Sequence, residues 1–115
     1  MAQKLILDGQ MTQLRKNNNA AMSGKDADFK PVVKFFMPGG AATWLITEIA
    51  ADGDTMFGLC DLGHGTPELG NVSLAELSAV RGRFGLKVER DAHFKAQKTL
   101  SEYTREAQAR GYISA

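Results

Sequence analysis

Residues 31–72 read PVVKFFMPGGAATWLITEIAADGDTMFGLCDLGHGTPELGNV, and this stretch decides the fold. It contains runs rich in Val, Ile, Phe, Trp and Thr, which have the composition of short β-strands. The runs are separated by Pro-Gly-Gly, Asp-Gly-Asp and Gly-His-Gly, all of which are turn sequences. Short strands joined by such turns predict an antiparallel meander with strands over residues 31–37, 42–50, 55–61 and 68–72.

A first helix is expected before this meander. Leu7, Met11 and Leu14 recur at helical spacing, and Asp8 has a side chain suited to capping. The pattern predicts a helix over residues 9–17, ended by three consecutive asparagines.

Further elements follow the meander. Ser73 and Glu76 have the spacing of a capping box, which predicts a short second helix. Residues 86–90 are extended in character and predict an edge strand. Thr99 and Glu102 form a second capping box, opening a helix over residues 99–110 that Gly111 ends.

These elements predict a single domain over residues 1–115 of the α+β class. We expect a small antiparallel sheet of four to five strands, arranged as a meander, with two or three helices packed against one face of the sheet.

The composition excludes several classes of protein. The chain has 115 residues, and 14 Lys and Arg against 13 Asp and Glu give a net charge of +1. This balance is not typical of a disordered tail or of a strongly charged nucleic-acid binder. The single cysteine, Cys60, cannot form an internal disulfide and is expected to be an inert, buried thiol. No apolar run is long enough for a signal peptide or a membrane span, so we expect a cytoplasmic protein.

The turns also predict a register for the hairpins. Folding at the first turn sets Phe36 near Trp44, and folding at the second sets Glu48 opposite Phe57 and Ile46 opposite Leu59. Folding at the third sets Asp61 near Glu68 and Leu59 near Gly70. One face then carries Phe35, Leu45, Ile49, Met56, Cys60 and Leu69. The other carries Lys34, Phe36, Trp44, Ile46, Glu48, Phe57, Asp61 and Glu68.

The second of these faces mixes aromatic and charged residues, which is typical of a binding surface. Phe36 and Trp44 are its candidate apolar anchors, and Glu48 and Glu68 its candidate polar contacts. The competing interpretation is that the C-terminal helix covers Phe36 and Trp44, which would give the sheet a core on both sides.

A basic segment over residues 81–98 is the second candidate surface. Arg81, Arg83 and Arg90 lie in it, and Phe84 and Phe94 interleave with its charges. Basic residues with aromatic neighbours can bind phosphates or stack on bases. The same charges are equally suited to salt bridges that hold the last strand to the domain.

Candidate catalytic chemistry is sparse. His64 and His93 lack the HxH or HxxxH spacing of a metal site, so no metal and no cofactor are expected. Glu48 and Glu68 could form a carboxylate pair, but the predicted register separates them along the sheet. The glycine-containing turns lie between strands, whereas a phosphate loop precedes a helix.

Several motifs together resemble a bacterial family. They are VKFF at residues 33–36, TW at 43–44, TE at 47–48, FGL at 57–59, ELG at 68–70, SL and EL at 73–77, and RG, GL and ERD between 81 and 91. The family is a domain of unknown function carried by plasmids, phages and integrated elements. The resemblance covers residues 3–100, so the helix over 99–110 is expected to be an extension. It implies a small accessory protein that acts on a component of host defence, and it transfers no catalytic residue.

Three functions therefore remain open. The first is a non-enzymatic binding protein, an inhibitor of a bacterial defence system that binds a protein or nucleoprotein target through Trp44 and the arginines of residues 81–90. The alternative is a nucleotide or signalling-molecule binder, with the arginines on a phosphate and Trp44 or Phe36 against a base. The last is a small hydrolase-like enzyme that uses Glu48, Glu68 and His64.

Overall fold

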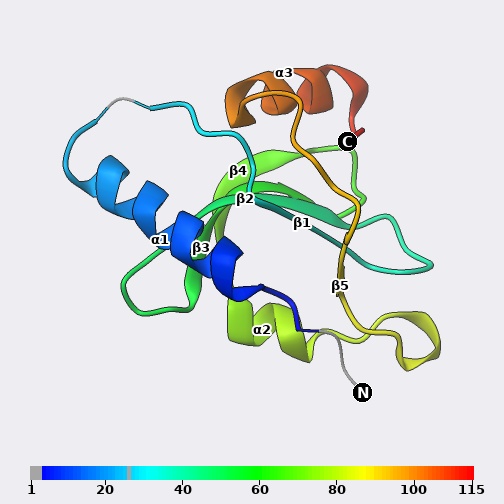
Figure 1. The fold of residues 1–115 in the computed structure, drawn as a ribbon. Helices are drawn as coiled ribbons and strands as arrows, with labels where there is room; N and C mark the ends of the chain where they lie inside the picture. The colour runs from blue at the N-terminus through cyan, green and yellow to red at the C-terminus, as the bar shows by residue number, and fades with distance from the viewer. Residues whose placement is uncertain (1–3, 26) are drawn as a thin grey trace.

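The protein is an antiparallel five-stranded sheet with helices on both faces, which confirms the α+β class (Figure 1). The computed structural model describes residues 4–25 and 27–115. The strand order is β4-β3-β2-β1-β5, so β1 to β4 form a meander and β5 lies at the opposite edge from β4, beside β1. The elements are α1 (Asp8–Met22), β1 (Val33–Phe36), β2 (Thr43–Ile49), β3 (Thr55–Asp61), β4 (Glu68–Ser73), α2 (Leu74–Ala79), the 3-10 turn η1 (Arg83–Gly85), β5 (Glu89–Arg90) and α3 (Leu100–Arg110).

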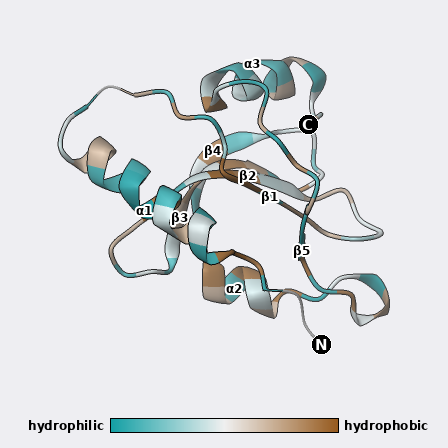
Figure 2. Cartoon of the chain, viewed as in Figure 1, coloured by the Kyte–Doolittle hydropathy of each residue, from teal (hydrophilic) through white to brown (hydrophobic). Residues whose placement is uncertain are grey.

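The sequence predicted helices on one face of the sheet, but the structure has helices on both faces. Leu14 of α1 and Leu77 of α2 belong to the core that contains Phe35 and Trp44, whereas α3 packs against Leu45 through a separate cluster. We call the Phe35 side the α1/α2 face and the Leu45 side the α3 face. Strands β2 and β3 contribute residues to both clusters, so they are covered from both sides, and apolar residues run along β2 (Figure 2).

The register differs from the predicted one in the first hairpin. The Met37 N–H donates to the Ala42 carbonyl at 3.0 Å, so four residues form the turn and Phe35, rather than Phe36, lies opposite Trp44. A shift of one residue moves a strand's side chains to the other face. The prediction that Trp44 lies on the face opposite Phe35 is therefore wrong.

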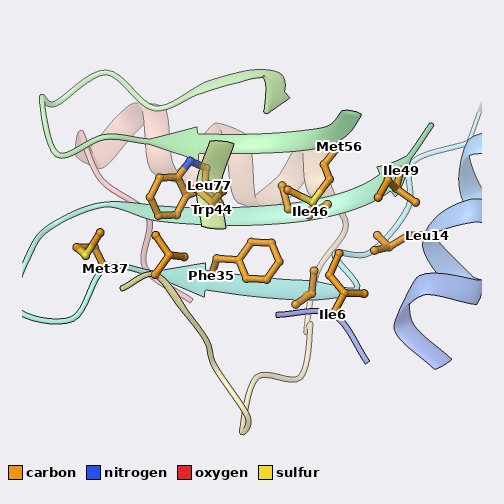
Figure 3. Close-up of a cluster of buried hydrophobic side chains, with 11 residues drawn as sticks. Ile6, Leu14, Phe35, Met37, Trp44, Ile46, Ile49, Met56 and Leu77 are labelled. Atoms are coloured by element: carbon orange, nitrogen blue, oxygen red, sulfur yellow. The ribbon is translucent and has the colours of Figure 1, made fainter. Parts of the chain in front are cut away.

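A β-bulge at Thr47 makes only part of the predicted register of the second hairpin correct. Glu48 does lie opposite Phe57, as predicted, but the register shifts between Ile46 and Glu48. Ile46 consequently lies opposite Gly58 and not opposite Leu59. Ile46 joins Trp44 and Phe35 in the core on the α1/α2 face (Figure 3).

The third hairpin is also offset by one residue. Cys60, rather than Asp61, lies opposite Glu68, and Leu59 lies opposite Leu69 rather than near Gly70. Residues directly opposite each other share a face. Cys60 and Glu68 are therefore on the α1/α2 face, and Leu69 is on the α3 face.

Helix α1 is longer than its sequence pattern predicted because its asparagines have partners. Asn17 is buried, and its Nδ2 donates to the Thr47 carbonyl at 2.9 Å. This bond satisfies a carbonyl at the bulge, where the ladder between β2 and β3 is interrupted. The helix therefore continues through the asparagine run to Met22, and its N-cap is Leu7 rather than Asp8.

The elements after the meander agree better with their predicted positions. Ser73 caps α2 by accepting from the Glu76 N–H at 3.1 Å. Thr99 and Glu102 form the capping box of α3, which ends at Gly111 with a φ of 85°. Strand β5 is an edge strand, as expected, although it is only two residues long.

Candidate functional site

A closed loop between α2 and β5 carries the most exposed aromatic side chain among the residues that the structure describes. An isolated bridge between Arg81 and Lys87 closes it, and we call it the 81–87 loop. The Gly82 N–H donates to the Leu86 carbonyl at 2.7 Å, and the Leu86 N–H donates to the Arg83 carbonyl at 3.2 Å. These internal bonds give the loop one defined backbone conformation.

The stem of the 81–87 loop is fixed against the turn between β1 and β2. A Cβ at Gly82 would lie 2.6 Å from the Met37 sulfur. The Met37 side chain therefore packs against the backbone of Gly82, where a larger residue would clash. A Cβ at Gly39 would be 3.8 Å from a Leu86 methyl group, an ordinary packing distance. Met37 is itself a core residue, and the loop is thereby attached to the core.

Phe84 forms the tip of this loop and is held in a strained conformation. Its side chain is 91% exposed. Its φ is 59°, in the left-handed region that bulky side chains rarely adopt. The Arg83 guanidinium carbon lies 5.7 Å from the centre of the ring. The ring therefore contributes little to the core, although its backbone conformation costs free energy.

The charged residues of the 81–87 loop are all cationic. Arg81, Arg83 and Lys87 are exposed, and none is in a salt bridge among the described residues. Arg81 donates from one guanidinium nitrogen to the carbonyls of Ser78 and Val80, each at 3.0 Å. These bonds place a cation at the C-terminal end of α2, where the helix dipole favours it.

Two other cations of the predicted basic segment contact other parts of the chain. Arg90 lies opposite Phe35 in the sheet and donates to the Lys4 carbonyl. Lys98 contacts the Glu106 carboxylate at 2.6 Å. Arg90 and Lys98 thus have partners elsewhere in the chain, whereas Arg81, Arg83 and Lys87 are exposed and form no salt bridge among the described residues.

The aromatic residues predicted as anchors on the sheet lie elsewhere than expected. Trp44 is only 5% exposed and packs in the core on the α1/α2 face, beside Leu77 (Figure 3). The interpretation of a core on both sides of the sheet is confirmed, but α2 rather than α3 accompanies Trp44. Phe36 is half-buried on the α3 face, opposite Glu89 of β5.

The two carboxylates of the predicted sheet surface do not come together. Glu48 lies opposite Phe57 near the end of β2 and accepts from the amide of Asn18 in α1 at 3.3 Å. Glu68 is exposed on the α1/α2 face at the start of β4. His64 lies in the exposed turn between β3 and β4. Glu68 is level with Cys60 and Trp44 in the register, four residues from Glu48 along β2, so these three side chains do not form one catalytic cluster.

Other groups with reactive side chains are equally dispersed. Burial raises the pKa of the half-buried Cys60 thiol, which disfavours the nucleophilic thiolate. Within the described parts of the chain, no cluster of three or more His, Cys, Asp or Glu is placed to hold a metal ion. No helix in those parts is long and apolar enough to cross a membrane.

A shallow groove of about 340 Å³ lies between α1 and the segment that enters β1. Nothing in the sequence pattern indicated it. Its walls carry no carboxylate, imidazole or thiol, so they offer no acid–base or nucleophilic chemistry. The lining residues are Gln13, Asn17, Phe29, Lys30, Pro31 and Val32.

The sequence pattern places Phe84 in the basic segment but does not distinguish it as an anchor. The available signal was its position in Arg-Gly-Arg-Phe-Gly, where two glycines and two arginines surround one apolar residue. Such a sequence favours a turn, and a turn exposes its central side chain.

Comparison with known proteins identifies the family. The family described as "Protein of unknown function (DUF2958)" matches residues 5–114, nearly the whole chain, and the protein belongs to this family. The match includes α3, so the expectation that this helix is an extension is wrong. Searches of curated proteins and of solved structures find no match to this chain.

Proposed function

We propose that this member of the DUF2958 family is a non-enzymatic binding protein that contacts an acidic protein surface through the 81–87 loop. Phe84 is the apolar anchor, and Arg81, Arg83 and Lys87 supply the charge. The observation that carries the proposal is the exposure of Phe84 in a left-handed conformation, on a loop fixed to the core.

The argument begins with what the fold gains from Phe84. A residue at φ 59° costs about 1–2 kcal/mol relative to an ordinary conformation. A side chain that is 91% exposed recovers little of this cost by burial. Strain that the packing of the domain does not need is typical of residues kept for contact with a ligand or partner.

The second step concerns the rigidity of the loop. The bond between Gly82 and Leu86 and the contact with Met37 hold the stem before any partner arrives. A loop ordered in advance loses less conformational entropy on binding than a mobile one. Aromatic residues, Phe among them, and arginine are also enriched at protein–protein interfaces.

The third step concerns the charge of the partner. The three cations of the 81–87 loop form no salt bridge among the described residues, so a partner with Asp or Glu side chains complements them. Arginine forms bidentate, charge-assisted hydrogen bonds with carboxylates. Complementary charge increases both the association rate and the specificity of binding.

The biological setting is part of the proposal and rests on the sequence resemblance alone. The resemblance implies a gene carried by plasmids, phages or integrated elements. We therefore propose that the protein acts in the bacterial cytoplasm and that its target is a component of a host defence system, which it inhibits by binding.

Affinity purification from bacterial cells, followed by mass spectrometry, tests the proposal. Phe84→Ser and the triple change of Arg81, Arg83 and Lys87 to Ala are each expected to abolish capture of the specific partner. The matched controls are Tyr112→Ser, which changes another exposed aromatic residue, and a triple change of Lys25, Lys95 and Arg110 to Ala. Both controls are expected to retain the partner.

Three outcomes contradict this function. Capture that survives both loop variants shows that the partner binds elsewhere on the molecule. Capture that nuclease treatment removes shows that the loop contacts nucleic acid, and stabilisation by a panel of nucleotides would favour the small-ligand alternative. In both latter cases the acidic protein partner is wrong even if the loop is the site.

A further inference from the structure

The two edges of the sheet differ, and the β4 edge is open. The other edge strand, β5, has two residues and is tied to the N-terminal segment through Arg90 and the Lys4 carbonyl. Strand β4 has six residues, and its pairing with β3 is continuous, with no register shift. Edges are usually protected by Pro and by charged residues, especially Lys; ELGNVS contains no Lys, no Pro and one charged residue, Glu68, at its first position.

The hydrogen bonds of the sheet show which backbone groups of β4 point outward. The Ala50 N–H donates to the Thr55 carbonyl, so odd-numbered residues of β3 direct their backbone groups toward β2. Even-numbered residues of β3 therefore face β4, where Gly58 lies opposite Gly70. It follows that Leu69 and Asn71 direct their N–H and C=O groups away from the sheet.

We propose that the protein forms a symmetric dimer in which β4 of one copy pairs with β4 of a second copy. The two strands run antiparallel about a two-fold axis at Gly70. Leu69 of each copy lies opposite Asn71 of the other, and the outward groups of these two residues supply four backbone hydrogen bonds. A ten-stranded sheet then runs through both copies.

The side chains of β4 are compatible with this register. Gly70 lies opposite its own copy on the axis, where neither chain has a side chain and a Cβ would have no atom within 4 Å. The strand's only charge, Glu68, lies opposite Val72 of the other copy, so no like charges face each other. Leu69 is 47% exposed and gains a neighbour on the α3 face.

A second copy is the occupant favoured here because the edge is complementary to itself. An interface with two-fold symmetry needs one patch that satisfies its own donors and acceptors. The two outward residues do this, since each donates to and accepts from the other across the axis. The net charge of +1 adds little repulsion between copies.

This dimer is independent of the proposed binding function. The 81–87 loop contacts the turn between β1 and β2, whereas the dimer uses the opposite end of the strand order. Each dimer therefore presents two loops to a partner. Failure of the dimer leaves the loop proposal standing, and failure of the loop leaves the dimer standing.

A charge exchange at Gly70 tests both the edge and the register. Sedimentation equilibrium of the unaltered chain is expected to give about twice the monomer mass of 12.5 kDa. Gly70→Asp and Gly70→Lys place like charges opposite each other on the axis, so each variant alone is expected to be a monomer. An equimolar mixture of the two is expected to recover the dimer mass, because Asp and Lys then face each other.

Matched variants separate pairing from folding. Gly70→Ala adds a side chain without a charge and is expected to remain a dimer. Asn71→Pro removes an outward N–H and is expected to be a monomer, while Asn71→Ala keeps that N–H and remains a dimer. Circular dichroism is expected to show the same fold for all of them.

Three results overturn the proposal. The first is a wild-type chain with the mass of a monomer at every concentration. The second is a folded Gly70→Asp variant that dimerises as well as the wild-type chain. The third is an equimolar mixture of the Asp and Lys variants that stays monomeric, which would show that Gly70 is not on the axis.

Discussion

Trp44 and Phe84 are both aromatic residues close to the end of the sheet where β1 turns into β2, yet their surroundings are opposite. Trp44 is 5% exposed and is held by the packing of strands and α2. Phe84 is 91% exposed and is held by the hydrogen bonds of its own backbone. The Trp44 ring stabilises the fold, whereas the Phe84 ring contributes little to its stability. Substitutions in the two regions should therefore affect different properties, the core its stability and the loop its binding.

The strongest test of the core concerns a glycine. A Cβ at Gly58 would lie 1.9 Å from the Leu45 carbonyl oxygen and 2.9 Å from the Ile46 Cα, both of which are backbone atoms in a buried strand. Gly58→Ala is expected to lower the free energy of unfolding by about 4 kcal/mol or more, measured by urea denaturation.

Gly70→Ala is the matched control, because Gly70 lies opposite Gly58 and has no atom within 4 Å of a Cβ. Its effect is expected to be below about 1 kcal/mol. Equal effects at the two glycines would show that the close approach at Gly58 does not constrain the core.

The next prediction concerns Trp44 itself. Trp44→Ala removes a large buried side chain, and the cavity next to Leu77 is expected to cost about 3–5 kcal/mol in urea denaturation. Tyr112→Ala, at a ring that is 55% exposed, is expected to change the stability by less than about 0.5 kcal/mol. A folded Trp44→Ala fraction that binds its partner normally would confirm the division; loss of binding by that folded fraction would break it.

A third substitution tests the connection between the two regions. Gly82→Ala directs a methyl group at the Met37 sulfur, 2.6 Å away, and is expected to cost about 1–3 kcal/mol because Met37 belongs to the core. Shortening Met37 to Ala removes the obstacle, so the double variant is expected to lose less stability than the two single losses together. Strictly additive losses, measured by a double-mutant cycle, would mean that the loop and the core do not contact each other.

Much of the fold could be predicted from the sequence because its signals are local. The capping residues Ser73 and Thr99 and the turn sequences between strands act within a few residues. The burial of Trp44 could not be predicted in the same way. It depends on the exact residues that close the turn after Met37, and an error of one position exchanges the two faces.

Long-range partners account for the other differences. The asparagine run of α1 is typical of a helix end when considered alone, but Asn17 bonds to a carbonyl thirty residues away at the bulge. The basic character of residues 81–87 could be predicted from the sequence. That Arg90 instead bonds to the Lys4 carbonyl could not, because the two residues are far apart in the chain.

The smallest expected effect has the opposite sign and concerns Phe84. Phe84→Gly relieves the left-handed strain, which costs about 1–2 kcal/mol, although the greater freedom of glycine in the unfolded chain offsets part of this gain. Loss of the contact between Arg83 and the exposed ring offsets about 0.5 kcal/mol more. The net change expected in urea denaturation is a stabilisation of about 0.5 kcal/mol. Phe84→Ala also removes the ring but keeps the strain, so it should not stabilise the chain. If both variants lose the partner while only the glycine variant gains stability, then the ring is needed for binding and the backbone strain lowers the stability. Equal stability of the two variants would mean that the backbone at residue 84 carries no strain.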